Sequence, residues 1–321
     1  MSTGLTLVEL LVVLSILAVI STVALRSIAQ ITEEKRFSAN ITQLEEIRES
    51  VLGGDDAGGF IGDIGRLPVA QGSIVDEQLS ELWDGGSLPA YSIQTPSGDS
   101  EVQLGVGWRG PYINLGINRN SLSDGFGKTL VFYEADGDSA TNGEEIAIVQ
   151  SLGVDGASGG SGVNSDTAVA LEAQSGAVSQ GLSNVEMSNS EDVVVIVQNE
   201  SGNILESDGQ FILVRAYGAS FAADGSGGLQ TLGQAKYDFT DAGDNPGGVT
   251  EIASRSFTLN SLPYGPKVFR AYQVDDSTLP GINDDLTEQP AVAPTAERIS
   301  VATAIVVQGR TNVLNLTLLQ R

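Results

Sequence analysis

Apolar residues are distributed in two different ways near the start of the chain. Residues 5–25 form a run of 21 residues in which Glu9 is the single charged residue. A helix rises about 1.5 Å per residue, so this run could cross a hydrocarbon core of roughly 30 Å. The pattern therefore predicts a transmembrane helix that carries one unexplained carboxylate.

After Arg26 the apolar positions become periodic. They recur three and four residues apart, at Phe37, Ile41, Leu44, Ile47 and Val51. This spacing predicts an amphipathic continuation of the same helix, ended by Gly53 and Gly54. Residues 5–52 would then form one helix of about 70 Å, half in lipid and half packed on a globular body.

The rest of the chain favours strands. Residues 129–133 and 145–150 are β-branched or aromatic runs around a Gly/Asp-rich turn, which predicts a hairpin. Residues 167–190 show little periodicity and are interpreted as a connector. Further strands are predicted at 192–198, 210–217, 256–259, 267–274, 298–308 and 311–320. Together they predict a β-sandwich of about seven strands, with Gly-, Asp- and Pro-rich loops at 218–250 and 275–295.

Charge and composition exclude several functions. The chain carries 16 Lys and Arg against 41 Asp and Glu, a formal net charge of -25, so nucleic acid is not an expected partner. It contains neither Cys nor His, which removes thiol and His-dependent nucleophilic catalysis and the usual zinc sites. We therefore expect no enzyme.

Glu9 is the residue of the opening segment that requires an explanation. A carboxylate within a membrane span costs roughly 2.5 kcal/mol or more, so a compensating partner is expected. Gly4 followed by Leu5 and the residues TLVELL resembles the leader of type IV pilins and type II secretion pseudopilins. The resemblance implies cleavage after Gly4 by a prepilin peptidase, methylation of the new terminus at Leu5, and pairing of Glu9 with a neighbouring subunit's terminal amine. An uncleaved single-span anchor is the alternative.

Three further segments narrow this resemblance. GWRGPYIN (107–114), SDGFGKTLVFY (123–133) and IVQSLGVDGASGGSGVNSD (148–166) occur in the order that is typical of the major pseudopilin of type II secretion systems. The predicted fold class is thus α+β, a long transmembrane and amphipathic helix on a small antiparallel sheet, followed by a β-sandwich. The expected divisions are a leader at 1–4, a transmembrane helix at 5–25, a periplasmic pseudopilin-like domain at 26–168, a linker at 169–190 and the sandwich at 191–321.

The glycine-rich loop after residue 151 is the expected ion site. Its carboxylate, amide and carbonyl oxygens lie on a flexible chain, and calcium takes six to eight oxygen ligands. The resemblance implies structural calcium, and the expected ligands are Leu152, Asp155, Asn164, Ser165 and Asp166. A solvated loop without an ion is the alternative.

The leading functional hypothesis is a structural subunit of a type II secretion pseudopilus, which drives protein export. Its expected partners are other pseudopilin subunits, the prepilin peptidase, an inner-membrane assembly platform and the membrane itself. Its expected localisation is the bacterial inner membrane, single-pass, with the globular domains in the periplasm. The alternative is a minor pilin or adhesin whose sandwich binds a ligand. Exposed aromatic residues would favour sugar binding, whereas strand alternation predicts that several are core residues. The candidates are Tyr237, Phe239, Tyr264, Phe269 and Tyr272.

Overall fold

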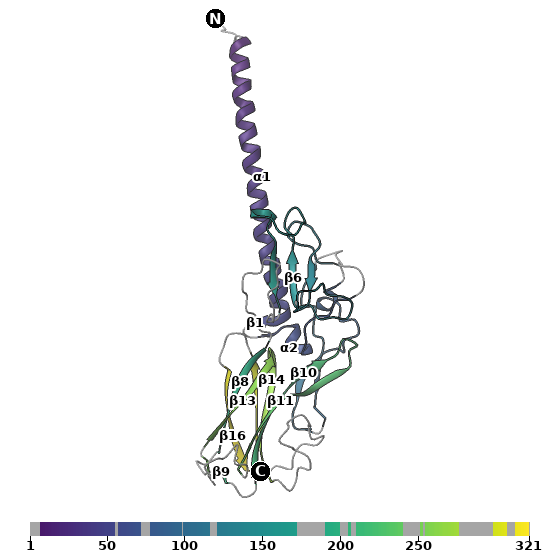
Figure 1. The fold of residues 1–321 in the computed structure, drawn as a ribbon, viewed down its shortest axis with the longest axis vertical. Coiled ribbons are helices and arrows are strands. Elements are labelled where there is room, and N and C mark those ends of the chain that lie inside the picture. The colour runs from purple at the N-terminus through teal and green to yellow at the C-terminus, as the bar shows by residue number, and fades with distance from the viewer. Residues whose placement is uncertain are drawn as a thin grey trace.

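The structure is a computed structural model in which most of the chain can be described. The described residues are 7–54, 57–71, 78–97, 99–115, 121–171, 190–199, 205–206, 210–239, 251–252, 254–275, 298–306 and 312–320. A single long helix leads into a first body of short strands, and a larger β-structure lies at the far end (Figure 1).

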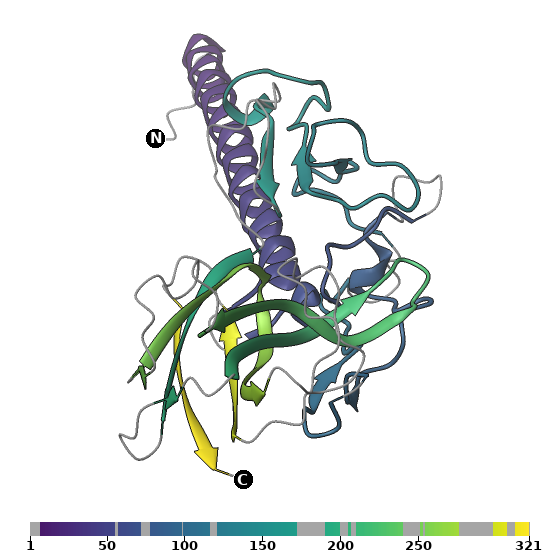
Figure 2. The same ribbon diagram turned by 60° about the horizontal axis from the view of Figure 1, so that its bottom comes forward.

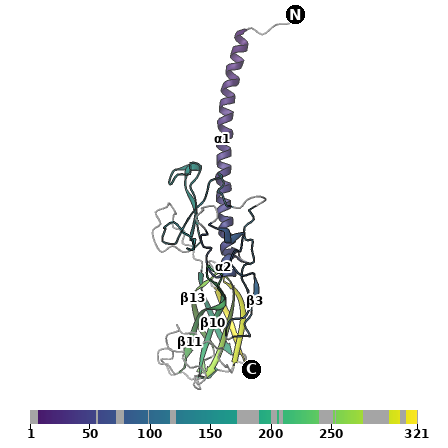
Figure 3. The same ribbon diagram turned by 90° about the vertical axis from the view of Figure 1, so that its right-hand side faces the viewer.

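The helix α1 spans Leu7–Leu52, 46 residues. Its N-terminal half projects away from the body in two perpendicular views (Figures 1 and 3). Its C-terminal half is docked, with Leu44, Ile47 and Val51 almost completely buried. The helix ends at Leu52, and the next residue, Gly53, has the positive φ (85°) that is common directly after a helix.

One residue of the docked face differs from the expectation. Ile41 is 44% exposed, and Asn40 is buried in its place. The side-chain nitrogen of Asn40 donates to Thr167 Oγ1 at 2.7 Å, and its oxygen accepts from the Gly125 amide at 3.3 Å. A Cβ on Gly125 would lie 2.6 Å from the Arg36 carbonyl oxygen. The turn at 123–128 therefore packs directly on the helix backbone, which requires glycine.

The first body consists of short elements beside α1. Besides the helix α2 (Phe60–Ile64) and two 3-10 turns (Ser80–Leu82 and Gly162–Asn164), its strands are β1 (Gly53–Gly54), β2 (Ala57–Gly58), β3 (Ser92–Gln94), β4 (Leu104–Val106), β5 (Val131–Tyr133), β6 (Ile148–Ser151) and β7 (Thr167–Ala170). Strands β5, β6 and β7 form an antiparallel sheet in that order. The predicted hairpin corresponds to β5 and β6, whereas β7 begins within the segment interpreted as a connector.

The second body is built from longer strands. They are β8 (Ser190–Asn199), β9 (Leu205–Glu206), β10 (Gln210–Phe221), β11 (Gly227–Asp238), β12 (Glu251–Ile252), β13 (Ser254–Pro263), β14 (Gly265–Asp275), β15 (Arg298–Val306) and β16 (Asn312–Gln320). Seven of them follow the order β11-β10-β14-β15-β16-β8-β13. Strand β11 lies where a variable loop was expected, because its alternation is masked by glycines at 227, 228 and 233.

This seven-stranded sheet folds into two layers. Among the described residues, strands β15 and β16 pair at two positions, Arg298 with Gln320 and Ile299 with Leu319, so the sheet bends between them. The opposite edges meet, because the Arg255 guanidinium of β13 lies 4.2 Å from the ring centroid of Tyr237 on β11. The result is sandwich-like, with β11-β10-β14-β15 in one layer and β16-β8-β13 in the other. Figure 2 shows these strands beside the docked end of α1.

The two bodies share one apolar core. Residues 211–219 of β10 are all buried, so both faces of this strand are covered. The backbones of the two bodies touch at Gly62 and Gly265. A Cβ on Gly265 would lie 2.3 Å from Gly62 Cα, so this contact requires glycine. A continuous cluster of buried apolar side chains runs from α1 into the sandwich.

A buried carboxylate also joins the bodies. Asp99 follows β3 and accepts hydrogen bonds from Arg270, Tyr272 and Tyr217, all of which are buried. The two tyrosine hydroxyls lie 2.9 Å apart, and burial raises the pKa of Tyr272 above its ordinary value. Arg270 also donates to the half-exposed Glu101. The loop between β3 and β4 is thus held against β10 and β14 by charge as well as by packing.

The expected α+β class is wrong. Among the described residues, 42% lie in strands and 24% in helices, so the fold is mostly β and sandwich-like. The long strands β10, β11, β13 and β14 contain more residues than the short strands beside α1. The glycines of β11 hide its strand pattern in the sequence, so the sequence understates the β content.

The expected transmembrane helix and the single-pass inner-membrane localisation are also wrong. In the part of the chain that the structure describes, no helix combines the length and the apolar character needed to cross a membrane.

Replacing Asp99 should destabilise the protein far more than replacing Glu101. Asp99→Asn removes the charge that compensates buried Arg270, so we expect the free energy of unfolding to fall by about 3 kcal/mol. Glu101→Gln is the matched control, with a side chain 48% exposed, and should cost under about 1 kcal/mol. Urea unfolding of the full chain in mild detergent measures both, and equal losses would contradict the central place of Asp99.

Candidate functional site

The residues expected to be processed lie at the very start of the chain. Gly4 and Leu5 lie outside the described residues. Glu9 belongs to α1, but its side chain is not among those described. Cleavage, methylation and the pairing of Glu9 therefore stay predictions.

The projecting half of α1 carries an unusual amount of exposed apolar surface. Among the described residues, 21 large hydrophobic side chains are exposed, and sixteen of them belong to this helix. They are Leu7, Val8, Leu10, Leu11, Val12, Val13, Leu14, Ile16, Leu17, Val19, Ile20, Val23, Leu25, Ile28, Ile31 and Ile41. Consecutive positions such as residues 10–14 point to every side of a helix, so the exposed surface surrounds the axis. A helix that is apolar all round is normally buried in its working state.

The glycine-rich loop folds back on itself. The Val154 amide donates to the Val163 carbonyl at 3.1 Å, and a Cβ on Gly160 would lie 2.3 Å from the Asn164 carbonyl oxygen. Asp166 sits at the foot of the loop, where one carboxylate oxygen accepts from the Gly159 amide at 2.9 Å. Its other oxygen is buried and has no hydrogen-bond partner among the described residues. An uncompensated carboxylate oxygen of this kind suits a cation.

The remaining expected ligands fit calcium less well. Asp155 lies at the exposed tip, where it accepts from the Ala157 amide at 3.1 Å, and Ser165 donates to the Asp166 carbonyl. The ammonium of Lys128 already lies near Gly156. Among the described residues, no group of three or more acidic side chains could hold a metal. Calcium at Leu152, Asp155, Asn164, Ser165 and Asp166 stays a prediction that rests chiefly on Asp166.

The turn at residues 123–128 is held in place by another buried acid, Asp124. Asp124 accepts from the amides of Phe126 and Lys128, and its second oxygen accepts from Ser151 Oγ at 2.6 Å. Asp124 therefore fixes the turn at 123–128 against β6. The sequence motif that resembled a pseudopilin at this position has a clear structural role here.

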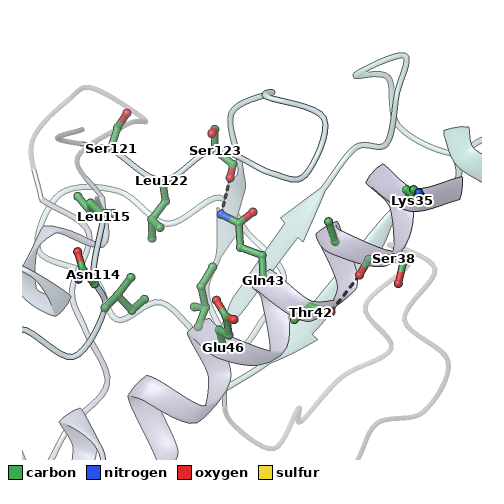
Figure 4. A pocket seen from close by; sticks show the side chains of 13 residues that line it. Lys35, Ser38, Thr42, Gln43, Glu46, Asn114, Leu115, Ser121, Leu122 and Ser123 are labelled. Carbon is green, nitrogen blue, oxygen red and sulfur yellow. Dashed lines mark hydrogen bonds between the residues drawn. The ribbon is translucent and has the colours of Figure 1, made fainter. Parts of the chain in front are cut away.

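A pocket lies between α1 and the segment around residue 115. Its volume is about 570 Å³, and polar side chains of α1 line one wall (Figure 4). Gln43 points across it and donates to the Ser123 carbonyl at 2.5 Å. The charged lining residues are Lys35 and Glu46. The lining offers hydrogen-bonding groups from α1 and from residues 114–123.

Lys267 is the most unusual titratable residue near the junction. It is fully buried, and its ammonium donates to the carbonyls of Tyr264 at 3.2 Å and Pro266 at 3.4 Å. Burial lowers the pKa of Lys267 to about 7, although the charge of Asp63 partly opposes this shift. Asp63 in turn accepts from Tyr112 and Arg109, and burial raises its pKa.

The aromatic residues that could have formed a sugar platform are core residues. Tyr237, Phe239, Tyr264, Phe269 and Tyr272 are each at most 6% exposed. Sequence reasoning missed the polar residues that accompany them, namely Asp99, Arg215, Lys267 and Arg270, all of which are buried. Basic residues within the strand KVFRAYQV were the available signal, because a fully buried strand seldom contains two of them without partners.

Comparisons with known proteins do not assign a family. No family model matches the chain, and no curated protein matches it. A solved structure with partial likeness is a protein from Bacteroides thetaiotaomicron described as polysaccharide-binding (DUF1812), with 10% sequence identity and a TM-score of 0.21. The match covers 40% of this chain and 47% of that one, and so low a score supports no argument about fold or function. The comparisons thus give no family support to the expected pseudopilin, secretion and calcium assignments.

Calcium binding at the loop can be tested through Asp166. If the ion binds the folded chain, a hundredfold excess over its dissociation constant should add about 2.7 kcal/mol to the free energy of unfolding. Asp166→Asn should abolish this gain, whereas Asp136→Asn, at an exposed hairpin turn, should keep it. Thermal unfolding with calcium or with a chelator measures the effect. Identical unfolding curves of the unsubstituted chain under the two conditions would contradict calcium binding at the loop.

Lys267 should make stability rise with pH. Its folded pKa of about 7 lies below the ordinary value of 10.5, so the unfolded chain binds more protons between these two pH values. The free energy of unfolding should therefore increase from pH 7 upward, by at most about 1.4 kcal/mol per pH unit. Lys267→Met should flatten this dependence. Urea titrations between about pH 7 and 9.5 compare the two chains, and parallel profiles would contradict the depressed pKa.

Proposed function

We propose that this chain is a structural subunit of a filament whose core is a bundle of α1 helices, of the pseudopilus kind that residues 4–11 resemble. The observation that carries the proposal is the apolar surface around the projecting half of α1. Burying one Val, Leu or Ile side chain is worth roughly 1.5–3 kcal/mol. Sixteen such side chains exposed on one helix provide a strong drive toward association.

Copies of the same helix are the occupants that fit this surface. A helix that is apolar on all sides must be surrounded, and a bundle of equivalent helices surrounds each member. In this proposal Glu9 of one subunit pairs with the amine that processing creates at Leu5 of its neighbour. A carboxylate in an apolar bundle is tolerated when a cation compensates it, so the pair would fix the axial register.

The second body would be displayed on the outside of such a filament. It lies at the opposite end of the molecule from the N-terminus of α1 (Figure 1). Its buried contacts with the first body, including the Asp99 cluster, tie it to the docked half of the helix. The proposed partners are other copies of the chain, a prepilin peptidase and the assembly machinery, and the proposed role is protein export.

Lysines in the projecting half of α1 should abolish assembly. Leu14→Lys with Leu17→Lys places two charges in the apolar surface, where both leucines are more than half exposed. We expect loss of filaments from the native host, together with folded exported proteins stranded inside the cell. Glu33→Lys with Glu34→Lys adds lysines to polar, exposed positions of the same helix and should leave both readouts unchanged.

The two readouts separate the possible outcomes. Loss of filaments with an unchanged set of exported proteins would keep the helical core and overturn the export role in favour of a surface pilus or adhesin. Filaments that persist in the leucine variant, or that are lost equally in the glutamate variant, would overturn the α1 bundle.

A further inference from the structure

Two arginines lie next to each other on the four-stranded layer of the second body. Arg215 of β10 is paired with Arg270 of β14, and directly opposite residues of antiparallel strands lie on the same face of a sheet. Both are buried, with exposed fractions of 4% and 2%. An arginine keeps its charge in a protein, so two like charges are adjacent where little water can screen them. Each guanidinium therefore needs negative or hydrogen-bonding partners of its own.

The acids near this pair serve one of the two arginines. Asp99 and Glu101 both accept hydrogen bonds from Arg270. The hydroxyls of Tyr217 and Tyr272 donate to Asp99 as well. The carboxylates of the loop between β3 and β4 are thus directed at β14.

Of the residues that the structure describes, only neutral ones are partners of Arg215. Its Nε donates to the side-chain oxygen of Gln234 at 3.3 Å, and its guanidinium carbon lies 5.9 Å from the ring centroid of Tyr272. Its Nη2 is buried and has no hydrogen-bond partner. An unmade hydrogen bond at a buried charged group is costly, and such a group in a native protein normally bonds a water molecule or an ion.

The surroundings of Arg215 select the kind of partner. A guanidinium only donates hydrogen bonds, and a negatively charged acceptor bonds it more strongly than water does. The carboxylates of Asp99 and Glu101 at the neighbouring Arg270 would repel an ion with two negative charges. Because Arg215 is 4% exposed, a large ligand could not reach Nη2. Glu101 is half-exposed, so the cluster reaches solvent on one side. These conditions fit a small ion with a single negative charge.

We propose that Arg215 binds a small monoanion, chloride or a simple carboxylate such as formate. The ion accepts a hydrogen bond from Nη2 and gives Arg215 the negative partner that the loop between β3 and β4 gives Arg270. It stabilises the folded chain at the place where this loop packs on β10 and β14. The site lies on the second body and does not depend on a bundle of α1 helices.

The test measures thermal unfolding of the full chain in mild detergent while chloride or formate replaces gluconate at constant ionic strength. Gluconate is a monoanion that is too bulky for a buried site. Above the dissociation constant of the ion, each tenfold rise in its concentration should raise the folding equilibrium constant about tenfold. Arg215→Met should remove this response. In gluconate alone, the variant should unfold at the temperature of the unsubstituted chain or higher, because an apolar replacement of a buried charge is often neutral or stabilising.

Arg255→Met is the matched control, because it removes the same charge from an exposed arginine of β13. The response to chloride and formate should be unchanged in this variant. A response to chloride alone would assign a halide, and a response to formate alone would assign a carboxylate. In crystals of the unsubstituted chain grown with bromide, anomalous scattering should place the ion within hydrogen-bonding distance of Nη2 of Arg215.

Three results would overturn the proposal. The first is an unfolding temperature that is the same in gluconate, chloride and formate. The second is an ion response that survives Arg215→Met or is lost equally in Arg255→Met. The third is a crystal structure in which Nη2 of Arg215 bonds a water molecule or an acidic side chain of the same chain, with no bromide beside it.

Discussion

The carboxylate of Asp99 is the interaction on which the arrangement of the two bodies depends. It is buried, and it compensates Arg270 while accepting from two tyrosines whose strands form the middle of the four-stranded layer. A buried arginine without this partner would be costly, so the loop between β3 and β4 has one favourable position. In that position the loop covers one face of β10 and β14. Residues 211–219 of β10 are therefore buried on both faces of the strand.

The helix is also fixed relative to the sandwich, through the shared core. The docked half of α1 is fixed by Asn40 and by three core residues, and the core continues without a break into the second body. The half of α1 that projects from the molecule carries exposed apolar side chains, and it lies at the opposite end from the second body (Figures 1 and 3).

Much of the local structure could be predicted from sequence, and the long-range structure could not. The periodicity after Arg26 gave the docked helix except at Asn40, whose burial depends on Thr167 and Gly125, which are distant in sequence. Most strands of the second body were found by alternation, but the glycines of β11 hid its pattern. The weight of β-structure was therefore underestimated. Asp99 and Arg270 are 171 positions apart in the sequence, so no local sequence pattern could predict their contact. The oxygens of the 152–166 loop were visible in the sequence, whereas the outward position of Asp155 was not.

The most direct test is to image filaments formed by the purified chain at a resolution that separates helices from sheets. The proposal that α1 drives assembly predicts a central bundle of long helices, with the β-rich bodies arranged outside it. Filaments with a β-rich core and peripheral helices, or a chain that forms no filaments under any condition in which it is folded, would contradict it.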